Sequence, residues 1–260
     1  MELKSIPADT RVLGVARPRF LPGGEEAVLV LHGFTGYPGE FTYLADRLHG
    51  AGFTVSVPRL PGHGTRGDDF LQTGWRDWLR RFTDAYLDLR AEYRTVHVAG
   101  LSMGGVIALL LAAHFDIPRI ALMAPAVVNR RRAIVLAPLL RLLFRRMNRG
   151  EGELPEDPDL RAIAREYGSY DWPAQADSLR KLQVRARREL PGVRSATLVY
   201  VSDADESVPP EAADLILNGI ASPEREKVHL RNSPHVMVNG PEREGIADGI
   251  IDWFGRTAKS

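Results

Sequence analysis

Cysteine is absent from the 260 residues of this chain. Its absence excludes disulfide bonds, thiolate catalysis and cysteine-ligated zinc together, so any nucleophile must be an oxygen or a nitrogen. No run of about 18 consecutive apolar residues occurs, and the first residues do not combine a basic segment with an apolar one. These absences predict a cytoplasmic protein without a membrane-spanning helix.

The chain also lacks an excess of charge of either sign, because 34 Lys and Arg residues face 33 Asp and Glu residues. This balance gives no reason to expect a nucleic-acid partner or a strongly acidic substrate. No group of histidines and carboxylates has the spacing of metal ligands, and we expect neither a metal ion nor a cofactor. With 44% hydrophobic residues, a chain of this length can bury the core of one medium-sized domain.

Short β-branched segments alternate with longer amphipathic ones, which is typical of an α/β fold with a mostly parallel central sheet and helices on both faces. The alternation breaks once, between residues 126 and 192, where proline, arginine and glutamate are dense. We therefore predict a single domain with a core of residues 1–125 and 193–260 and an inserted cap of residues 126–192. The expected strands are 27–31, 54–57, 96–99, 119–123, 196–201 and 227–230, and the expected helices are 40–49, 75–92, 103–114, 211–219 and 242–254.

Residues 100 to 105 read Gly-Leu-Ser-Met-Gly-Gly and lie between a predicted strand and a predicted helix. In that setting G-x-S-x-G is a nucleophile elbow, whose sharp turn lifts the serine Oγ above the sheet. Small residues are needed at Gly100 and Gly104 because strand and helix pack closely there. Ser102 is therefore the candidate nucleophile.

A serine nucleophile needs a base and a carboxylate that orients it, expected in the chain order Ser, Asp or Glu, His. The loop after the predicted strand 196–201 carries three carboxylates, those of Asp203, Asp205 and Glu206. We favour Asp205 because it lies in the middle of the loop and precedes the apolar pair Val208-Pro209. The other two are interpreted as solvated turn residues.

The candidate base is His235, in the loop between the last predicted strand and the last predicted helix. His229 is the only other histidine beyond the candidate carboxylates, and it falls inside a strand pattern, where a packed or surface role is expected. His63 lies in a Pro-Gly-His-Gly turn and is interpreted as structural.

Residues 32 to 36 read His-Gly-Phe-Thr-Gly directly after an apolar strand pattern. Such a loop offers the backbone N–H of Phe34 to an oxyanion, and Met103, the residue after the nucleophile, offers the second N–H. His32 is expected to fix this loop by hydrogen bonding. The Phe34 side chain is also a candidate for lining the acyl site.

Five segments together resemble the α/β-hydrolase superfamily and are similar to those of bacterial monoacylglycerol lipases and small thermostable carboxylesterases. The resemblance implies an α/β-hydrolase fold, a triad of Ser102, Asp205 and His235, and an oxyanion hole from Phe34 and Met103. It thus selects Asp205 among the three carboxylates, and it covers nearly the whole chain except the cap. The segments are residues 31–36, 58–65, 100–105, 201–210 and 230–236.

The predicted cap contains a basic segment without a single acidic residue, in which leucines are interleaved. With Pro138 at a first helical position, Arg141, Arg145 and Arg149 are expected on one helical face and an apolar face opposite. We favour an apolar face that roofs the active site, with Leu139 and Leu143 touching the acyl chain. The alternative is weak contact with an anionic membrane surface. The arginines of the segment are Arg130, Arg131, Arg132, Arg141, Arg145, Arg146 and Arg149.

The expected reaction is hydrolysis of a carboxylic ester with a medium or long acyl chain, first of all a monoacylglycerol, through an acyl-enzyme on Ser102. An aminopeptidase or a thioesterase on the same scaffold is the alternative. The aminopeptidase needs a buried cap carboxylate for the substrate's amino group. A ligand-binding protein without turnover would bind tightly and release no burst of product. The candidates for that carboxylate are Glu151, Glu153, Glu156 and Glu166.

Overall fold

A seven-stranded sheet is the centre of the computed structural model, which describes residues 6–130 and 132–256. All neighbouring strands run parallel except the pair of β1 and β3. The predicted mostly parallel central sheet is confirmed. Across the sheet the order is β1 (Arg19–Leu21), β3 (Thr54–Val57), β2 (Glu26–Leu31), β4 (Thr95–Leu101), β5 (Arg119–Met123), β8 (Ala196–Ser202) and β9 (Arg225–Leu230).

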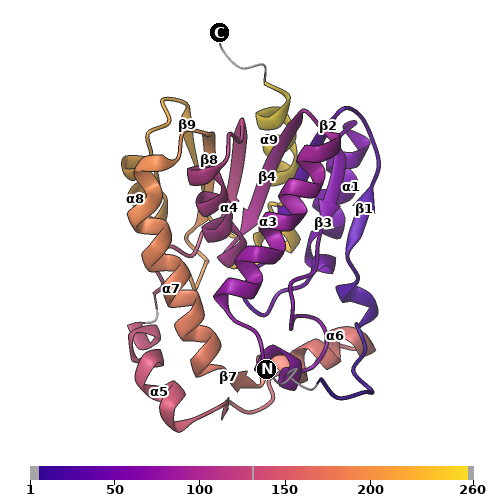
Figure 1. Ribbon diagram of the computed structural model, residues 1–260, viewed down its shortest axis with the longest axis vertical. Helices are drawn as coiled ribbons and strands as arrows, with labels where there is room; N and C mark the ends of the chain where they lie inside the picture. Colours follow the sequence, from indigo (N-terminus) through magenta and orange to yellow (C-terminus); the bar gives the residue numbers. More distant parts are fainter. Residues whose placement is uncertain (1–5, 131, 257–260) are drawn as a thin grey trace.

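Helices cover both faces of this sheet (Figure 1). In the view of Figure 1, α3 and α4 lie in front of the strands, and α1 and α9 lie behind them. The central strands are consequently buried on both faces, which is why their sequences are continuously apolar. The helices of the predicted core are α1 (Thr42–Gly50), α2 (Gly67–Phe70), α3 (Trp75–Glu92), α4 (Met103–His114), α8 (Glu211–Gly219) and α9 (Arg243–Gly255), with single turns η1 (Gly14–Ala16), η2 (Pro38–Phe41) and η6 (Met237–Asn239).

The segment between β5 and β8 contains short elements and one long helix, α7 (Pro173–Glu189). Leu182 and Ala186 of α7 are buried, and α7 packs along α4. A helix as apolar on all sides as α4 requires such a cover. The exact limits of the cap, residues 126–192, stay a prediction. Its other elements are η3 (Arg132–Leu136), α5 (Ala137–Leu143), β6 (Met147–Asn148), α6 (Pro158–Ile163), η4 (Ala164–Gly168), β7 (Tyr170–Asp171) and η5 (Leu190–Gly192).

The predicted helix with Arg141, Arg145 and Arg149 on one face is wrong. Helix α5 ends at Leu143, and Phe144 follows in an extended conformation. Strand β6 then pairs antiparallel with β7. Hydrogen bonds between these two short strands replace helical ones, so only the first of the three arginines lies on the helix. Arg131, another member of the basic segment, lies outside the described residues.

Helix α5 packs against α7 and leaves most of its leucines exposed. Arg141 points toward α7, where its Nη1 lies 3.2 Å from the buried carboxylate of Asp177. Leu139, Leu142 and Leu143 are 60%, 74% and 69% exposed. The predicted contact of Leu139 and Leu143 with an acyl chain stays a prediction. None of the helices in the described ranges is both long and apolar enough to cross a membrane.

Candidate active site

Ser102 occupies the sharp turn between β4 and α4. Its φ is 55° and its ψ is −116°, a conformation that non-glycine residues rarely adopt. The turn is tight because a Cβ at Gly104 would lie 2.1 Å from the carbonyl oxygen of Leu31, and a Cβ at Gly100 would lie 2.5 Å from the carbonyl oxygen of Gly104. Only glycine fits at these two positions, and the hydroxyl of Ser102 is thereby held above the end of the sheet.

Ser102, Asp205 and His235 are joined by hydrogen bonds. The Ser102 Oγ lies 2.9 Å from His235 Nε2, and His235 Nδ1 lies 2.9 Å from Asp205 Oδ2. The three residues follow β4, β8 and β9, whose carboxyl ends meet at one edge of the parallel sheet. With Nδ1 donating to the carboxylate, Nε2 is left to accept the serine proton.

The carboxylate of Asp205 is almost completely buried, with 1% of the side chain exposed. Its Oδ1 accepts the backbone N–H groups of Ser207 and Val208 at 2.7 and 3.0 Å. Burial alone would raise the pKa of Asp205, but hydrogen bonds from His235 and the two N–H groups outweigh it and hold the pKa below its ordinary value. This carboxylate is consequently ionised and fixed in orientation at neutral pH.

Arg130 holds the Asp205 loop from the cap side, a role that composition does not reveal. Its Nε donates to the carbonyl oxygen of Asp205 at 2.7 Å, and its backbone N–H donates to the carbonyl oxygen of Ser207 at 2.9 Å. The sequence places this arginine only within the basic segment. Its place in the segment that follows β5, the strand beside β8, is the one signal that could have tied it to the site.

Glu242 holds the loop that carries His235, and sequence analysis misses it. Its carboxylate accepts the backbone N–H groups of Arg231 and Asn232 at 3.3 and 3.1 Å and the Ser233 hydroxyl at 2.7 Å. The hydrogen bond from Ser233 is the main cause that lowers the pKa of Glu242. A glutamate directly before the last helix reads as an ordinary surface residue, so the sequence offers no signal for this contact.

The loop from Gly33 to Gly36 lies against Ser102. A Cβ at Gly33 would lie 3.2 Å from the Cβ of Ser102. Within residues 6–130 and 132–256, the backbone N–H groups of Phe34 and Met103 make no hydrogen bond to a protein group. Unpaired N–H groups beside a serine hydroxyl can stabilise an oxyanion, which is the arrangement expected of these two residues.

His32 fixes this loop as predicted. Its Nε2 accepts the backbone N–H of Leu60 at 3.1 Å, and its Nδ1 lies 3.1 Å from the carbonyl oxygen of Gly33. The ring of Phe34 packs edge-on against Phe70 and Trp78, with ring centroids 5.4 and 5.9 Å away. Both sides of the loop are thus held in place by buried groups.

His63 belongs to the same buried aromatic cluster, 4.9 Å from the ring of Phe70. Its Nδ1 donates to the carbonyl oxygen of Pro61 at 3.0 Å. Burial lowers the pKa of His63 to about 4, so the ring is neutral at neutral pH. Among the described residues, His63 makes no hydrogen bond to Ser102, Asp205 or His235, in agreement with a structural role.

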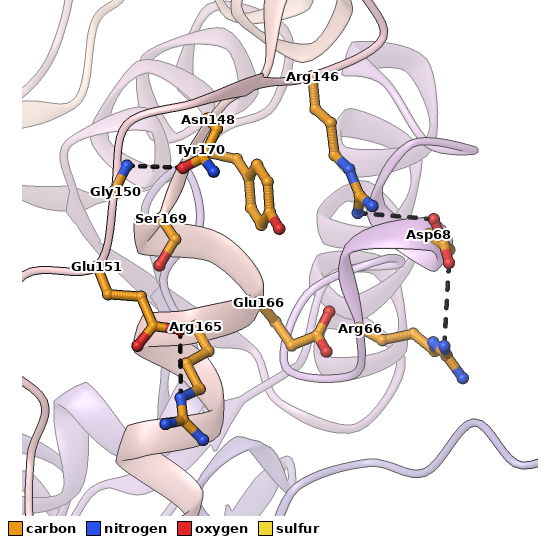
Figure 2. A pocket seen from close by; sticks show the side chains of 10 residues that line it. All are labelled: Arg66, Asp68, Arg146, Asn148, Gly150, Glu151, Arg165, Glu166, Ser169 and Tyr170. Carbon is orange, nitrogen blue, oxygen red and sulfur yellow. Dashed lines mark hydrogen bonds and ion pairs between the residues drawn. The ribbon is translucent and has the colours of Figure 1, made fainter.

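A polar cavity of about 340 Å³ lies between α2 and the cap, and Ser102, Asp205 and His235 are not among its lining residues (Figure 2). Three arginines and three carboxylates line it, so their charges balance. Arg66 and Arg146 both approach the carboxylate of Asp68, at 3.9 Å each. The lining residues are Arg66, Asp68, Arg146, Asn148, Gly150, Glu151, Arg165, Glu166, Ser169 and Tyr170.

The four cap glutamates considered for an aminopeptidase are not buried carboxylates awaiting a partner. Glu151, Glu153 and Glu156 are exposed. Glu166 is half-buried, and its Oε2 accepts the backbone N–H of Gly67 at 2.8 Å. No group of three or more His, Asp or Glu side chains in the described part of the chain could hold a metal ion.

Comparison with known proteins agrees with this geometry. The alpha/beta hydrolase family model matches residues 28–248. The thermostable monoacylglycerol lipase of Bacillus sp. (strain H-257) is 35% identical over 257 residues, which are 95% of this chain and 97% of that protein. The carboxylesterase of Bacillus subtilis (strain 168) is 27% identical over 242 residues, 92% and 96% of the two chains.

Among solved structures, one reported for the metagenome-derived lipolytic enzymes LipS and LipT superposes with a TM-score of 0.84. It is 29% identical in sequence, and the match covers 93% of this chain and 98% of that chain. The family match extends over the strands that carry the Ser102, Asp205 and His235 network. This protein belongs to the alpha/beta hydrolase family.

Proposed function

We propose that the protein is a serine hydrolase of carboxylic esters with medium or long acyl chains, and that monoacylglycerols are its preferred substrates. The observation that carries the proposal is the continuous hydrogen-bonded series from Asp205 through His235 to the Oγ of Ser102. The identity with a relative named monoacylglycerol lipase supports the substrate class.

In the first half of the reaction, His235 takes the proton of Ser102 as the Oγ attacks the ester carbonyl carbon. The carbonyl oxygen becomes an oxyanion, which the N–H groups of Phe34 and Met103 stabilise. The tetrahedral intermediate then breaks its bond to the alcohol oxygen. His235 returns its proton to this alcohol, which leaves, and the acyl group stays on Ser102.

In the second half, water replaces the alcohol. His235 takes a proton from water as its oxygen attacks the acyl-enzyme, and the same two N–H groups hold the new oxyanion. Collapse of this intermediate releases the carboxylic acid, and His235 returns the proton to Ser102 Oγ. Asp205 stays ionised throughout and stabilises the imidazolium that forms twice in the cycle.

The alternatives on the same scaffold have less support. An aminopeptidase needs a buried carboxylate for the substrate's amino group, and the four cap glutamates are exposed or already accept a backbone N–H. A thioesterase would use the same residues and differ only in the leaving group. The cytoplasmic location stays a prediction of the sequence.

The test is a comparison of initial rates for the parent and Ser102→Ala. The substrates are p-nitrophenyl esters of increasing acyl length, a 1-monoacylglycerol and an amino-acid arylamide. Ester hydrolysis that rises with chain length, includes the monoacylglycerol and is lost in Ser102→Ala supports the proposal. Ser222→Ala removes another buried serine hydroxyl and serves as the control. Arylamide cleavage with negligible ester hydrolysis overturns the proposal in favour of a peptidase.

A further inference from the structure

Glu40 carries a carboxyl group inside the protein that the reaction described above does not use. The residue lies in η2, and its Oε2 is buried without a hydrogen-bond partner in residues 6–130 and 132–256. A buried carboxylate without a partner is costly, because its charge loses the water that would solvate it. A group of this kind calls for an explanation other than packing.

The Oε2 of Glu40 lies against the turn that contains Phe34. A Cβ on Gly36 would lie 2.6 Å from this oxygen, and 3.2 Å from both the backbone nitrogen and the carbonyl oxygen of Gly33. Glycine at position 36 therefore leaves room for the carboxyl group. Gly33 also lies against the nucleophile, since its own Cβ would be 3.2 Å from that of Ser102. The backbone of Gly33 is thus close both to Glu40 and to the nucleophile.

This turn sets the direction of the Phe34 N–H. The N–H of Gly36 donates to the carbonyl oxygen of Gly33 at 3.1 Å and closes a turn with Phe34 and Thr35 at its centre. Thr35 has a φ of 58°, in the left-handed region that β-branched residues seldom adopt. Such a turn persists only when its surroundings hold it. A group packed against its backbone, as Glu40 is, therefore bears on the oxyanion site.

No ion pair with a cation reaches the Glu40 carboxyl group in the part of the chain that the structure describes. The elements packed against η2 are η1, α1 and η6, of which only α1 contains titratable side chains. Arg47 of α1 pairs with Asp248, and Arg19 pairs with Asp46. A negative charge on Glu40 is therefore left without a paired cation. The other titratable groups around η2 are Arg17, His32, Tyr37, Tyr43, His49, Asp157, Asp159 and His235.

The surroundings of Glu40 favour its neutral form. Burial raises the pKa of its carboxyl group to about 7, and a hydrogen bond from the Tyr37 backbone opposes this rise only in part. Burial, Glu40 and Asp157 together raise the pKa of the Tyr37 phenol to about 12, so this neighbour stays neutral. The charge beside the turn consequently changes near neutral pH, and the charge change comes from Glu40.

We propose that Glu40 is a positioning residue of the oxyanion loop, which supports ester hydrolysis as a neutral acid and slows it when ionised. The neutral carboxyl group packs against the backbone of Gly33 and Gly36 without adding charge. The ionised group places a negative charge close to the loop whose Phe34 N–H stabilises the oxyanion, and like charges repel. This inference rests on the proposed function, because it concerns the oxyanion of that reaction.

The test compares kcat of the parent and Glu40→Gln on a short water-soluble p-nitrophenyl ester between about pH 5.5 and about pH 8.5. Glutamine has nearly the size of glutamate and never ionises. The ratio of the two kcat values cancels the titration of His235, which both proteins share. We expect the variant to equal the parent at the acid end and to exceed it about tenfold at the alkaline end, the order expected of unit charges about 10 Å apart. The midpoint should lie at about pH 7.

Two features separate this role from a merely structural one. KM should stay nearly unchanged, because the charge acts on the transition state and not on the bound substrate. A structural defect would instead lower kcat by a similar factor at every pH. Glu25→Gln removes an exposed carboxylate just before β2 and serves as the control, with the parental kcat throughout. Product is read at the wavelength where p-nitrophenol and its anion absorb equally, because the product titrates in the same range.

A second measurement follows the ionisation without hydrolysis. The protein is labelled with ¹³C at the side-chain carboxyl carbons of glutamate, and their NMR resonances are recorded against pH. One resonance of the parent should titrate at about pH 7 and be missing in Glu40→Gln. The parent spectrum alone tests for a glutamate that titrates in this range, so the proposal stays testable even if the variant does not fold.

Two results would overturn the role of Glu40 while ester hydrolysis by the parent, lost in Ser102→Ala, leaves the proposed function intact. One is a ratio of variant to parent kcat that does not change with pH. The other is a parent in which no glutamate titrates above about pH 6. A parent that hydrolyses no ester at any pH would remove the proposed function, and the role of Glu40 with it.

Discussion

Asp205 contacts the His235 ring more closely through its Oδ2 than through its Oδ1. Oδ2 lies 2.9 Å from the His235 Nδ1, whereas Oδ1 also accepts two backbone N–H groups of its own loop. The two oxygens are therefore not equivalent. Oδ1 keeps the loop in shape and lies 3.1 Å from His235 Nδ1, and Oδ2 makes the shorter contact that orients the imidazole.

Asp205→Asn is expected to lower kcat about 10⁴-fold because it reverses the imidazole tautomer. The amide oxygen must remain at the Oδ1 position to accept the N–H groups of Ser207 and Val208. The amide NH₂ then faces His235 Nδ1, which must accept, so Nε2 carries the proton and cannot take that of Ser102. Ester hydrolysis rates measure this effect, with exposed Asp203→Asn as the control. A variant that keeps about a tenth or more of the parental kcat contradicts this mechanism.

Glu242→Gln is expected to lower kcat about tenfold and to leave KM nearly unchanged, because it misplaces the base without touching the substrate. The amide has one accepting oxygen, so it cannot satisfy all three donors of the His235 loop. Steady-state kinetics separate kcat from KM. Glu244→Gln, an exposed neighbour on α9, is the control. A rise in KM alone would show that Glu242 supports the substrate site and not the base.

Two glycine variants are expected to change stability in opposite directions. Gly104→Ala should lower the free energy of unfolding by about 3 kcal/mol or more, because its Cβ would overlap the backbone oxygen of Leu31. Gly245→Ala should raise it by about 0.5–1 kcal/mol, because this helical position has open space and alanine favours helix. Urea unfolding measures both. Equal stability of the two variants would contradict the packing argument for the elbow.

His63 is expected to make the folded state less stable in acid. Burial lowers its pKa from 6.5 to about 4, so the unfolded chain binds a proton in this interval and the folded chain does not. Stability therefore falls as pH drops from 6.5 toward 4, with a loss of up to about 3 kcal/mol from this group. Buried His32, whose pKa is also lowered by burial, acts in the same direction.

The measurement is the free energy of urea unfolding at about pH 7 and about pH 5, for the parent and His63→Gln. Glutamine can still donate to the Pro61 carbonyl but does not titrate, so the variant should lose less stability between the two pH values. His49→Gln, at an exposed position, should behave like the parent. A decline of the same size in all three proteins would remove His63 as the cause.

Many helices and strands of the core are predictable from the local sequence pattern. The limits of α3 and α4 are predictable because one is strongly amphipathic and the other is apolar throughout between Ser102 and Phe115. Strand β1 escapes prediction because it has three residues at a sheet edge, with Phe20 exposed. The predicted helix through Arg149 fails because its local periodicity competes with pairing to Tyr170 and Asp171, which only the folded chain brings near.

The candidate site is also predictable from the sequence only in part. The elbow motif and the chain order suffice to nominate Ser102, Asp205 and His235, which the structure joins by hydrogen bonds. The roles of Arg130 and Glu242 are not predicted because both residues act through backbone groups of other loops. Such contacts leave no motif in a sequence. The sequence does not predict the orientation of α5 either, since periodicity gives the two faces of a helix but not which face packs against the protein.

The hydrogen bond between Ser102 and His235 joins residues 133 positions apart in the chain. It can form only after β8 and β9 have joined the sheet, because their loops carry Asp205 and His235. Contacts of such separation are slow to form during folding. After dilution from urea, the time at which ester hydrolysis recovers therefore reports when the sheet is complete. This recovery should lag behind the return of the helical circular dichroism signal.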